Sequence, residues 1–345
     1  MCHIIVDLLR TIKRPPWRTI VPGVGLLFIL YITYLLWSPG LDVRDGRDDR
    51  GQNGIWLAHG WLGADSWFVS NSKRDEIIKY RDPVKIRNLA WLLDSHHIKY
   101  VFPHLCPADE YGNLPATDPQ QVEAFLDRFA GFRVLPWVGG PNGVQVRVND
   151  KKWRAGFVAS IVELLKEHPR FAGVHINIEP MPSGDQGFLS LLDELKTALP
   201  LGKIISVAAY PPPTRFQPDA DIHWDKDYFS QVSGHCDQMV VMMYDTALRK
   251  PKFYQYLMSQ WTTEAVSWTK SGHVLLGVPA YEDQGVGYHD PKVENLENAL
   301  MGIHRGLSHE TMPLNYEGVA IYSEWEMDSN KWEYLEQHFL SQVRM

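Results

Sequence analysis

Hydrophobic and polar positions follow a repeated order along most of the chain. A short apolar run comes first, and a longer amphipathic stretch follows it. The apolar runs end near glycine, proline or aromatic residues, as buried strands commonly do. They predict eight strands, at residues 55–59, 100–105, 133–138, 173–179, 204–209, 238–244, 274–279 and 318–322.

The stretches between these strands carry apolar residues at helical spacing. They predict helices at residues 84–93, 122–129, 153–167, 187–198, 253–269 and 292–304. Eight alternating units of this kind predict an α/β fold, a (β/α)8 TIM barrel, with its active site at the carboxyl ends of the strands. An open doubly wound sheet is the alternative, but no GxGxxG motif follows the first strand.

One apolar segment, residues 20–37, contains no charged residue. As a helix it would be ~27 Å long, which is just enough to cross a bilayer. Four basic residues and a single acidic residue precede it, and the basic side of such a segment stays in the cytoplasm. We therefore expect a cytoplasmic basic segment (1–19), a transmembrane signal-anchor helix (20–37) and an extracytoplasmic remainder of a single-pass membrane protein.

A cleaved signal peptide and a buried core helix are the alternatives for this segment. The long basic lead and the lack of a small-x-small motif after Trp37 favour an uncleaved anchor. Residues 38–53 are rich in glycine, aspartate and arginine and predict a linker. Residues 54–345 then form the barrel.

Composition excludes several classes of protein. The chain has 345 residues, of which 45% are hydrophobic and 22% are charged, so it is not a disordered chain. Its net charge of −7 argues against binding of nucleic acid through phosphate contacts. The three cysteines, Cys2, Cys106 and Cys236, build neither a disulfide framework nor a CxxC metal site. Cys106 and Cys236 fall at opposite ends of non-neighbouring strands, so we expect no bridge between them.

Aromatic residues, acids and amides gather at the predicted carboxyl ends of the strands. Aromatic faces stack on the apolar faces of sugar rings, and polar edges bind the hydroxyl groups, so this composition suits a carbohydrate. The alternative is that these aromatics simply rim the barrel. The candidate binding residues are His59, Trp61, His104, Trp137, His175, Tyr281, Tyr322 and Trp325.

The fourth predicted strand carries a polar face. Because side chains alternate along a strand, His175, Asn177 and Glu179 share one face, and Glu179 is nearest the site. A buried carboxyl group among aromatic residues has a raised pKa, which a general acid requires. A structural glutamate paired with an arginine is the alternative.

Four strand motifs resemble those of family 18 glycosidases, the chitinase family. Residues 172–179, AGVHINIE, resemble the fourth-strand signature D-G-x-D-x-D-x-E; the glycine and the final glutamate match, and all three aspartates are replaced. Residues 242–245 resemble M-x-Y-D, residues 277–281 resemble G-x-P-x-Y, and residues 318–322 resemble G-x-x-x-W with Tyr322 in place of tryptophan. The segment INIE, residues 176–179, is also similar to the corresponding strand of family 85 endo-N-acetylglucosaminidases, which use an Asn/Glu pair.

The resemblance implies a mechanism and roles. Glu179 would be the acid/base, and the acetamido oxygen of the substrate would attack instead of a protein nucleophile. Asn177 would orient that acetamido group, Tyr244 and Asp245 would contact or position it, and Tyr322 or Trp325 would lie under the sugar at subsite −1. His175 would either donate a hydrogen bond to Asn177 or fill the core.

We therefore expect a membrane-anchored glycoside hydrolase that acts on glycans containing N-acetylglucosamine, without a cofactor or metal. A non-catalytic glycan-binding lectin is the main alternative, because three aspartates are missing. A metal hydrolase using His59, His104, His175 and Glu179 is a second alternative, but the His-x-His motif usual at the first strand is absent.

Overall fold

The computed structural model describes residues 17–215, 217–283, 285–308 and 312–341, and for residues 17–22 only the backbone. The predicted cytoplasmic segment falls mostly on residues 1–16, outside the described residues. The chain divides into two compact units, Met1–Pro39 and Gly40–Met345.

The first unit contains helix α2 (Trp17–Leu36), which covers nearly all of the predicted span at residues 20–37. In the part of the chain that the structure describes, no helix has both the length and the apolar character needed to cross a membrane. The side chains of residues 20–22, at the start of the predicted span, lie outside that part.

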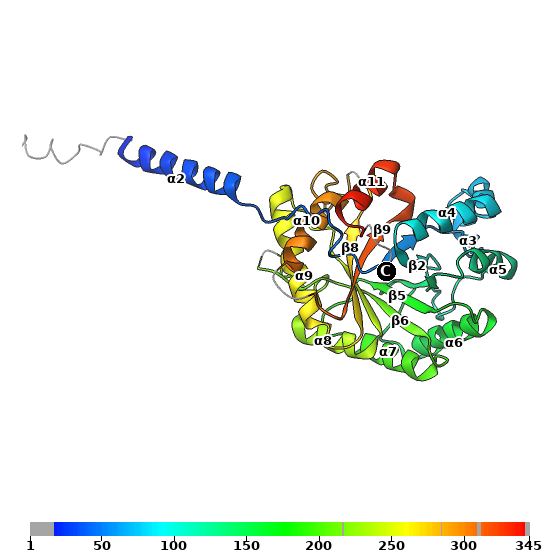
Figure 1. Ribbon diagram of the computed structural model, residues 1–345. Helices are drawn as coiled ribbons and strands as arrows, with labels where there is room; N and C mark the ends of the chain where they lie inside the picture. Colours follow the sequence, from blue (N-terminus) through cyan, green and yellow to red (C-terminus); the bar gives the residue numbers. More distant parts are fainter. Residues whose placement is uncertain (1–16, 216, 284, 309–311, 342–345) are drawn as a thin grey trace, which may run out of the picture. The chain divides into compact units, whose positions relative to one another are not determined.

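The second unit is built on one sheet of nine parallel strands, drawn at the centre of Figure 1. The order of the strands is β3-β2-β1-β9-β8-β7-β6-β5-β4. The strands are β1 (Asn53–Leu57), β2 (Ile98–Pro103), β3 (Arg133–Val134), β4 (Trp137–Pro141), β5 (Gly173–Glu179), β6 (Ile204–Ala209), β7 (Gln238–Met242), β8 (His273–Pro279) and β9 (Tyr316–Tyr322).

The sheet closes on itself as a barrel does. The first strand pairs with the last, β1 with β9. The two ends of the order, β3 and β4, are consecutive pieces of one strand interrupted at residues 135 and 136, and β5 continues from them through a hydrogen bond from the His175 N–H to the Pro136 carbonyl (2.9 Å). Counting β3 and β4 as one strand gives the eight strands of the predicted (β/α)8 barrel.

Helices surround the sheet in Figure 1. Two of them, α8 and α11, and the short α3 were not predicted from the sequence. The helices are α3 (Ser66–Ser70), α4 (Pro83–Ser95), α5 (Pro119–Arg128), α6 (Lys151–Glu167), α7 (Gln186–Ala198), α8 (Lys226–His235), α9 (Pro251–Trp268), α10 (Leu296–Leu307) and α11 (Ser329–His338), with 3-10 turns at Arg74–Tyr80 and Glu324–Glu326.

Aspartate begins many of these helices. The carboxylate of the capping residue accepts a hydrogen bond from a backbone N–H of the first turn, which satisfies a donor that the helix leaves open. The capping residues of α4, α5, α6, α7, α8 and α11 are Asp82, Asp118, Asp150, Asp185, Asp225 and Asp328. The caps place the start of α4 to α7 one to three residues before the predicted positions.

The predicted linker differs from the structure over residues 40–53. Two carboxylates of this segment, Asp48 and Asp49, are buried in the second unit. The Asp48 carboxylate lies 2.5 Å from Nδ1 of His304, and the Asp49 carboxylate lies 2.5 Å from Nδ1 of His97. The many charges of the segment indicated a solvated chain, but Asp48 pairs with the buried His304 and Asp49 with the half-buried His97, so the folded part of the chain begins before β1.

Candidate active site

Strand β5 brings the predicted polar face to the inside of the barrel. Val174, Ile176 and Ile178 point outward and are buried in the hydrophobic core. The alternate residues His175, Asn177 and Glu179 therefore face inward, as the alternation predicted. Gly139 on β4 lies opposite Asn177 with a φ of +128°, and a Cβ there would meet the Asn177 carbonyl oxygen, so this approach requires glycine.

Glu179 lies half-buried at the carboxyl end of β5. Burial raises the pKa of its carboxyl group, and the negative charge of Asp245 raises it further. Hydrogen bonds from Asn177 and Tyr210 act in the opposite direction, and the Tyr210 hydroxyl donates to Oε2 across 3.2 Å. The group is thus favoured in its protonated form and held at a fixed position, which is what a general acid needs.

Asn177 places an unused acceptor beside that acid. The residue is 8% exposed, and its side chain lowers the pKa of the neighbouring Glu179 carboxyl group. Among the residues that the structure describes, the Oδ1 atom has no hydrogen-bond partner although it is buried. A buried carbonyl oxygen without a donor is uncommon and indicates a place where a ligand N–H or O–H binds.

His175 is a core residue. The Trp56 indole N–H donates to its Nε2 (3.1 Å), and its Nδ1 is hydrogen bonded to the Ser206 hydroxyl (2.9 Å). Ser206 in turn donates to Gln238. Burial lowers the pKa of His175 to about 3, so the ring is neutral. Because both ring nitrogens are hydrogen bonded to these partners, His175 does not donate to Asn177. It fills the core, which was the second of its two predicted roles.

A cavity of about 320 Å³ opens beside Asn177 and Glu179. One wall is a row of aromatic rings. Trp67 stacks on His59 at 4.0 Å, His59 is tilted against His104 at 3.6 Å, and His104 meets Trp137 edge-on at 4.4 Å, measured between ring centroids. Burial, together with the charge of Lys73, lowers the pKa of His59 to about 4, so this ring is uncharged at neutral pH. The wall is therefore aromatic and neutral, which suits the apolar face of a sugar.

A second cavity shares this wall and extends the site. Tyr322 and Trp325, both predicted to bind substrate, line it together with Lys73. Trp61, also predicted, does not join them: it is buried against Tyr80, at 4.9 Å between ring centroids, and is part of the hydrophobic core. The strand-end position of Trp61 suggested the site, but the loop after β1 turns it toward the helices.

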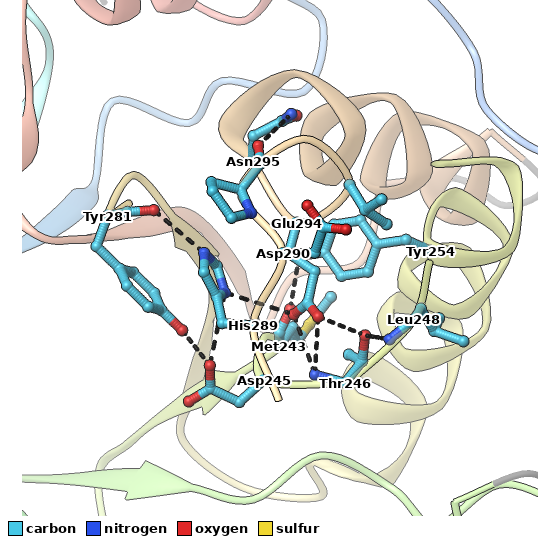
Figure 2. Close-up of polar contacts among 12 residues, drawn as sticks. Met243, Asp245, Thr246, Leu248, Tyr254, Tyr281, His289, Asp290, Glu294 and Asn295 are labelled. Carbon is cyan, nitrogen blue, oxygen red and sulfur yellow. Dashed lines mark hydrogen bonds and ion pairs between the residues drawn. The ribbon is translucent and has the colours of Figure 1, made fainter. Parts of the chain in front are cut away.

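The remaining predicted residues, Tyr244 and Asp245 after β7 and Tyr281 after β8, form a cluster with Tyr322 at the end of β9. The Tyr244 ring stacks on Tyr322 at 5.5 Å, and Tyr281 stands perpendicular to both rings. The Tyr281 hydroxyl donates to Asp245, as Figure 2 shows, and burial raises the pKa of Asp245. Asp245 has a φ of +62°, a strained backbone conformation that is common at functional sites.

Several residues of the site were missed from the sequence. Trp67 lies on helix α3, whose five residues are too few to show a helical periodicity in the sequence. Tyr210 follows β6 directly and was not among the predicted site residues, although it donates to the proposed acid. The metal-ligand set that was considered, His59, His104, His175 and Glu179, does not converge. Of the described residues, the group able to surround a cation is instead Asp245, His289 and Glu294. Cys106 and Cys236 are both free and buried, so the expected absence of a bridge is confirmed.

Comparisons with known proteins agree with this geometry. The family model for "Glycosyl hydrolases family 18" matches residues 66–337. No curated protein matches the chain. Among solved structures, the spore cortex-lytic enzyme SleL of Bacillus megaterium QM B1551 is similar at a TM-score of 0.56 and 13% identity, covering 87% of this chain and 77% of that one.

Two chitinases are similar as well. A family 18 chitinase from Pseudoalteromonas aurantia has a TM-score of 0.53 and 16% identity, covering 84% of this chain and all of that chain (100%). The chitinase RmChi1 from Rhizomucor miehei has a TM-score of 0.50 and 12% identity, covering 83% of this chain and 99% of that one. At these identities the likeness shows a shared fold.

Proposed function

Because the chain belongs to glycosyl hydrolases family 18, and is therefore a glycoside hydrolase, we propose that it cleaves glycans containing N-acetylglucosamine with the substrate's acetamido group as nucleophile. One observation carries this proposal: the free, buried Oδ1 of Asn177 lies next to a glutamate whose pKa is raised. An acceptor for an amide N–H and a proton donor for the glycosidic oxygen are the two groups that this reaction requires.

In the first step, Glu179 donates its proton to the glycosidic oxygen while the acetamido oxygen attacks the anomeric carbon. The bond to the leaving sugar breaks, and an oxazolinium ring forms. Asn177 accepts the acetamido N–H through Oδ1 and holds the carbonyl oxygen beneath the anomeric carbon. In the second step, the Glu179 carboxylate takes a proton from water as that water opens the ring, so the configuration is retained.

The replacement of aspartate by Asn177 changes the electrostatics of this scheme. An amide oxygen accepts the N–H but carries no negative charge to balance the oxazolinium. Asp245 is the neighbouring carboxylate, and its charge already acts on Glu179. We infer that Asp245, held by Tyr281, positions the acetamido group.

Replacing Tyr210 should change the pH dependence of turnover. The Tyr210 hydroxyl stabilises the ionised form of Glu179, so Tyr210→Phe raises the pKa of that group. Since the acid must be protonated, kcat falls as the pH rises through this pKa. We expect the alkaline limb of the kcat profile to move upward by roughly one pH unit. A profile that stays in place or moves to lower pH would show that Tyr210 does not stabilise the ionised form of Glu179.

A non-catalytic glycan-binding protein is the second candidate, because the three family aspartates are replaced. Binding alone uses the aromatic wall but gains nothing from a protonated Glu179. The two functions separate in an assay of reducing-end release from chitin oligosaccharides and from peptidoglycan, with binding measured in parallel. Binding of either glycan without turnover would favour the lectin.

We also propose that residues 20–37 attach the barrel to a membrane, with the barrel on the extracytoplasmic side. The support is the uncharged sequence of the segment and the exposure of its large apolar side chains, such as Leu27 (67%) and Leu36 (79%). Apolar side chains of this kind are more stable in lipid than in water.

Two truncations should behave differently. Removing residues 1–39 takes away only the first unit, so we expect a folded chain that leaves the membrane fraction. Removing residues 1–53 also deletes Asp48 and Asp49, and His304 and His97 lose their buried partners. We expect the free energy of unfolding of this shorter chain to fall by about 3 kcal/mol or more, measured in urea. Equal stability of the two would show that residues 40–53 are only a linker.

A further inference from the structure

Three side chains with metal-binding chemistry converge at Asp245, and Figure 2 shows them together. His289 Nδ1 lies 3.6 Å from the Asp245 carboxylate and 3.8 Å from the Glu294 carboxylate. All three ligand atoms lie within 4.8 Å of one another. The side chains of His289 and Glu294 are fully buried, whereas that of Asp245 is 40% exposed. The cluster is therefore closed around His289 and Glu294 and open to solvent at Asp245.

Tyr281 sets the orientation of the His289 ring. Its ring stacks on Tyr281 at 4.1 Å, and its Nε2 lies 3.2 Å from the Tyr281 carbonyl oxygen. A carbonyl only accepts hydrogen bonds, so Nε2 carries the proton and, in the neutral ring, Nδ1 presents a lone pair. A histidine that binds a metal commonly donates its other N–H in this way.

The Nδ1 atom is buried and, among the described residues, has no hydrogen-bond partner. It faces two carboxylates, which are acceptors as well. Three acceptors thus point at one another with no donor among them, and a buried group of this kind is costly unless a cation or a shared proton lies between. This free nitrogen, rather than the acids alone, indicates a ligand.

The carboxylates are also held in place. Glu294 accepts hydrogen bonds from the Thr246 backbone N–H (3.0 and 3.1 Å) and from the Thr246 hydroxyl (2.9 Å). Asp245 accepts one from Tyr281. Partners of this kind orient metal ligands. Ligands around a tetrahedral zinc ion are about 3.3 Å apart, so the two separations from His289 need to close by only a few tenths of an ångström, and the separation between the two carboxylates, which is within 4.8 Å, by about 1.5 Å at most.

We propose that Asp245, His289 and Glu294 bind one divalent transition-metal ion, zinc being the ion that suits one imidazole and two carboxylates. The ion would hold Asp245 in place, and its remaining coordination position would lie on the exposed side of the cluster, at Asp245. This site goes beyond the proposed function and does not depend on it. No metal was expected from the sequence, which has neither a CxxC site nor a His-x-His motif at the first strand; His289 and Glu294 lie in the loop before α10, outside every motif considered.

The test measures zinc binding to the full-length chain after treatment with a chelator. We expect one zinc ion per chain by elemental analysis, with a dissociation constant in the micromolar range or tighter by calorimetry. Glu294→Gln keeps the shape of the side chain and an oxygen for Thr246 but removes the charged ligand, so zinc affinity should fall at least 100-fold. Asp290→Asn changes a neighbouring carboxylate outside the triad and should bind zinc as the parent does.

Asp245→Asn gives a second route to the same answer, since this half-exposed ligand can be changed with little effect on folding, and it should also lose zinc. No stoichiometric zinc on the parent would overturn the proposal and leave a triad that shares a proton. Zinc bound equally by the parent, Glu294→Gln and Asp245→Asn would overturn it too, as adventitious binding elsewhere. Because binding is read directly, these outcomes are independent of whether the chain hydrolyses N-acetylglucosaminides.

Discussion

Glu179→Gln should abolish turnover and leave glycan affinity within a few-fold of the parent. The amide keeps the size of the side chain and its contact with Tyr210, but it cannot give a proton to the leaving oxygen. Loss of general acid catalysis reduces the rate by ~10²–10⁴-fold. The measurement is kcat on an N-acetylglucosamine oligosaccharide, with the dissociation constant determined by calorimetry.

Glu324→Gln is the matched control for this experiment. Burial raises the pKa of Glu324 to about 7, so it is a second carboxyl group with the protonation behaviour of an acid near the site. The groups that act on its carboxyl group, however, are the Ala58 backbone and the Trp61 side chain, which lower this pKa, and Asn177 is not among them. We expect kcat of this variant to change less than tenfold. If Glu324→Gln is inactive and Glu179→Gln retains full activity, the acid is Glu324.

Asn177→Ala should lose activity only where the substrate carries an acetamido group. The Oδ1 acceptor disappears, so the acetamido oxygen is no longer held beneath the anomeric carbon; misplacement of a nucleophile costs ~10²-fold or more. The melting temperature should stay close to that of the parent. The measurement compares kcat/KM of parent and variant on paired N-acetylglucosaminides and glucosides. A parent that cleaves glucosides equally well would point to a protein nucleophile, with Asp245 and Glu324 as the carboxylates to test.

Asn177→Asp is the conservative counterpart, because it restores the residue of the family pattern. We expect it to retain or exceed the activity of the parent. The added charge beside Glu179 should raise the pKa of that group further, so the alkaline limb of the profile moves to higher pH. His175 is neutral and buried and cannot offset this charge. A variant as inactive as Asn177→Ala would show that the site is adapted to a neutral amide.

The sequence predicted best those elements in which a single periodicity ran from end to end in uniform surroundings. Strand β5 lies between β4 and β6 inside the barrel, so alternation alone assigned Asn177 and Glu179 to the inner face. Helix ends were predicted less well, because apolar spacing does not register a capping residue. Asp82 and Asp118, each followed by proline, were the signals that could have corrected the starts of α4 and α5.

The side-chain positions that could not be predicted from the sequence depend on contacts between residues far apart in the chain. Trp61 and Trp67 both follow β1, yet the first packs into the core and the second lines the cavity. Asp48 looks solvated in a run of charges, and only the fold reveals its buried partner His304. Such choices are made by tertiary packing, which overrides local pattern.

The most direct test of the account is the binding of an N-acetylglucosamine thiazoline, a stable mimic of the oxazolinium, to the parent and to Asn177→Ala. Competitive inhibition of the parent, weakened at least 10-fold in the variant, with ordered density for the thiazoline against Asn177 and Glu179 in a crystal, is the result that substrate assistance predicts. A parent that hydrolyses its glycan and is not inhibited by saturating thiazoline would contradict it.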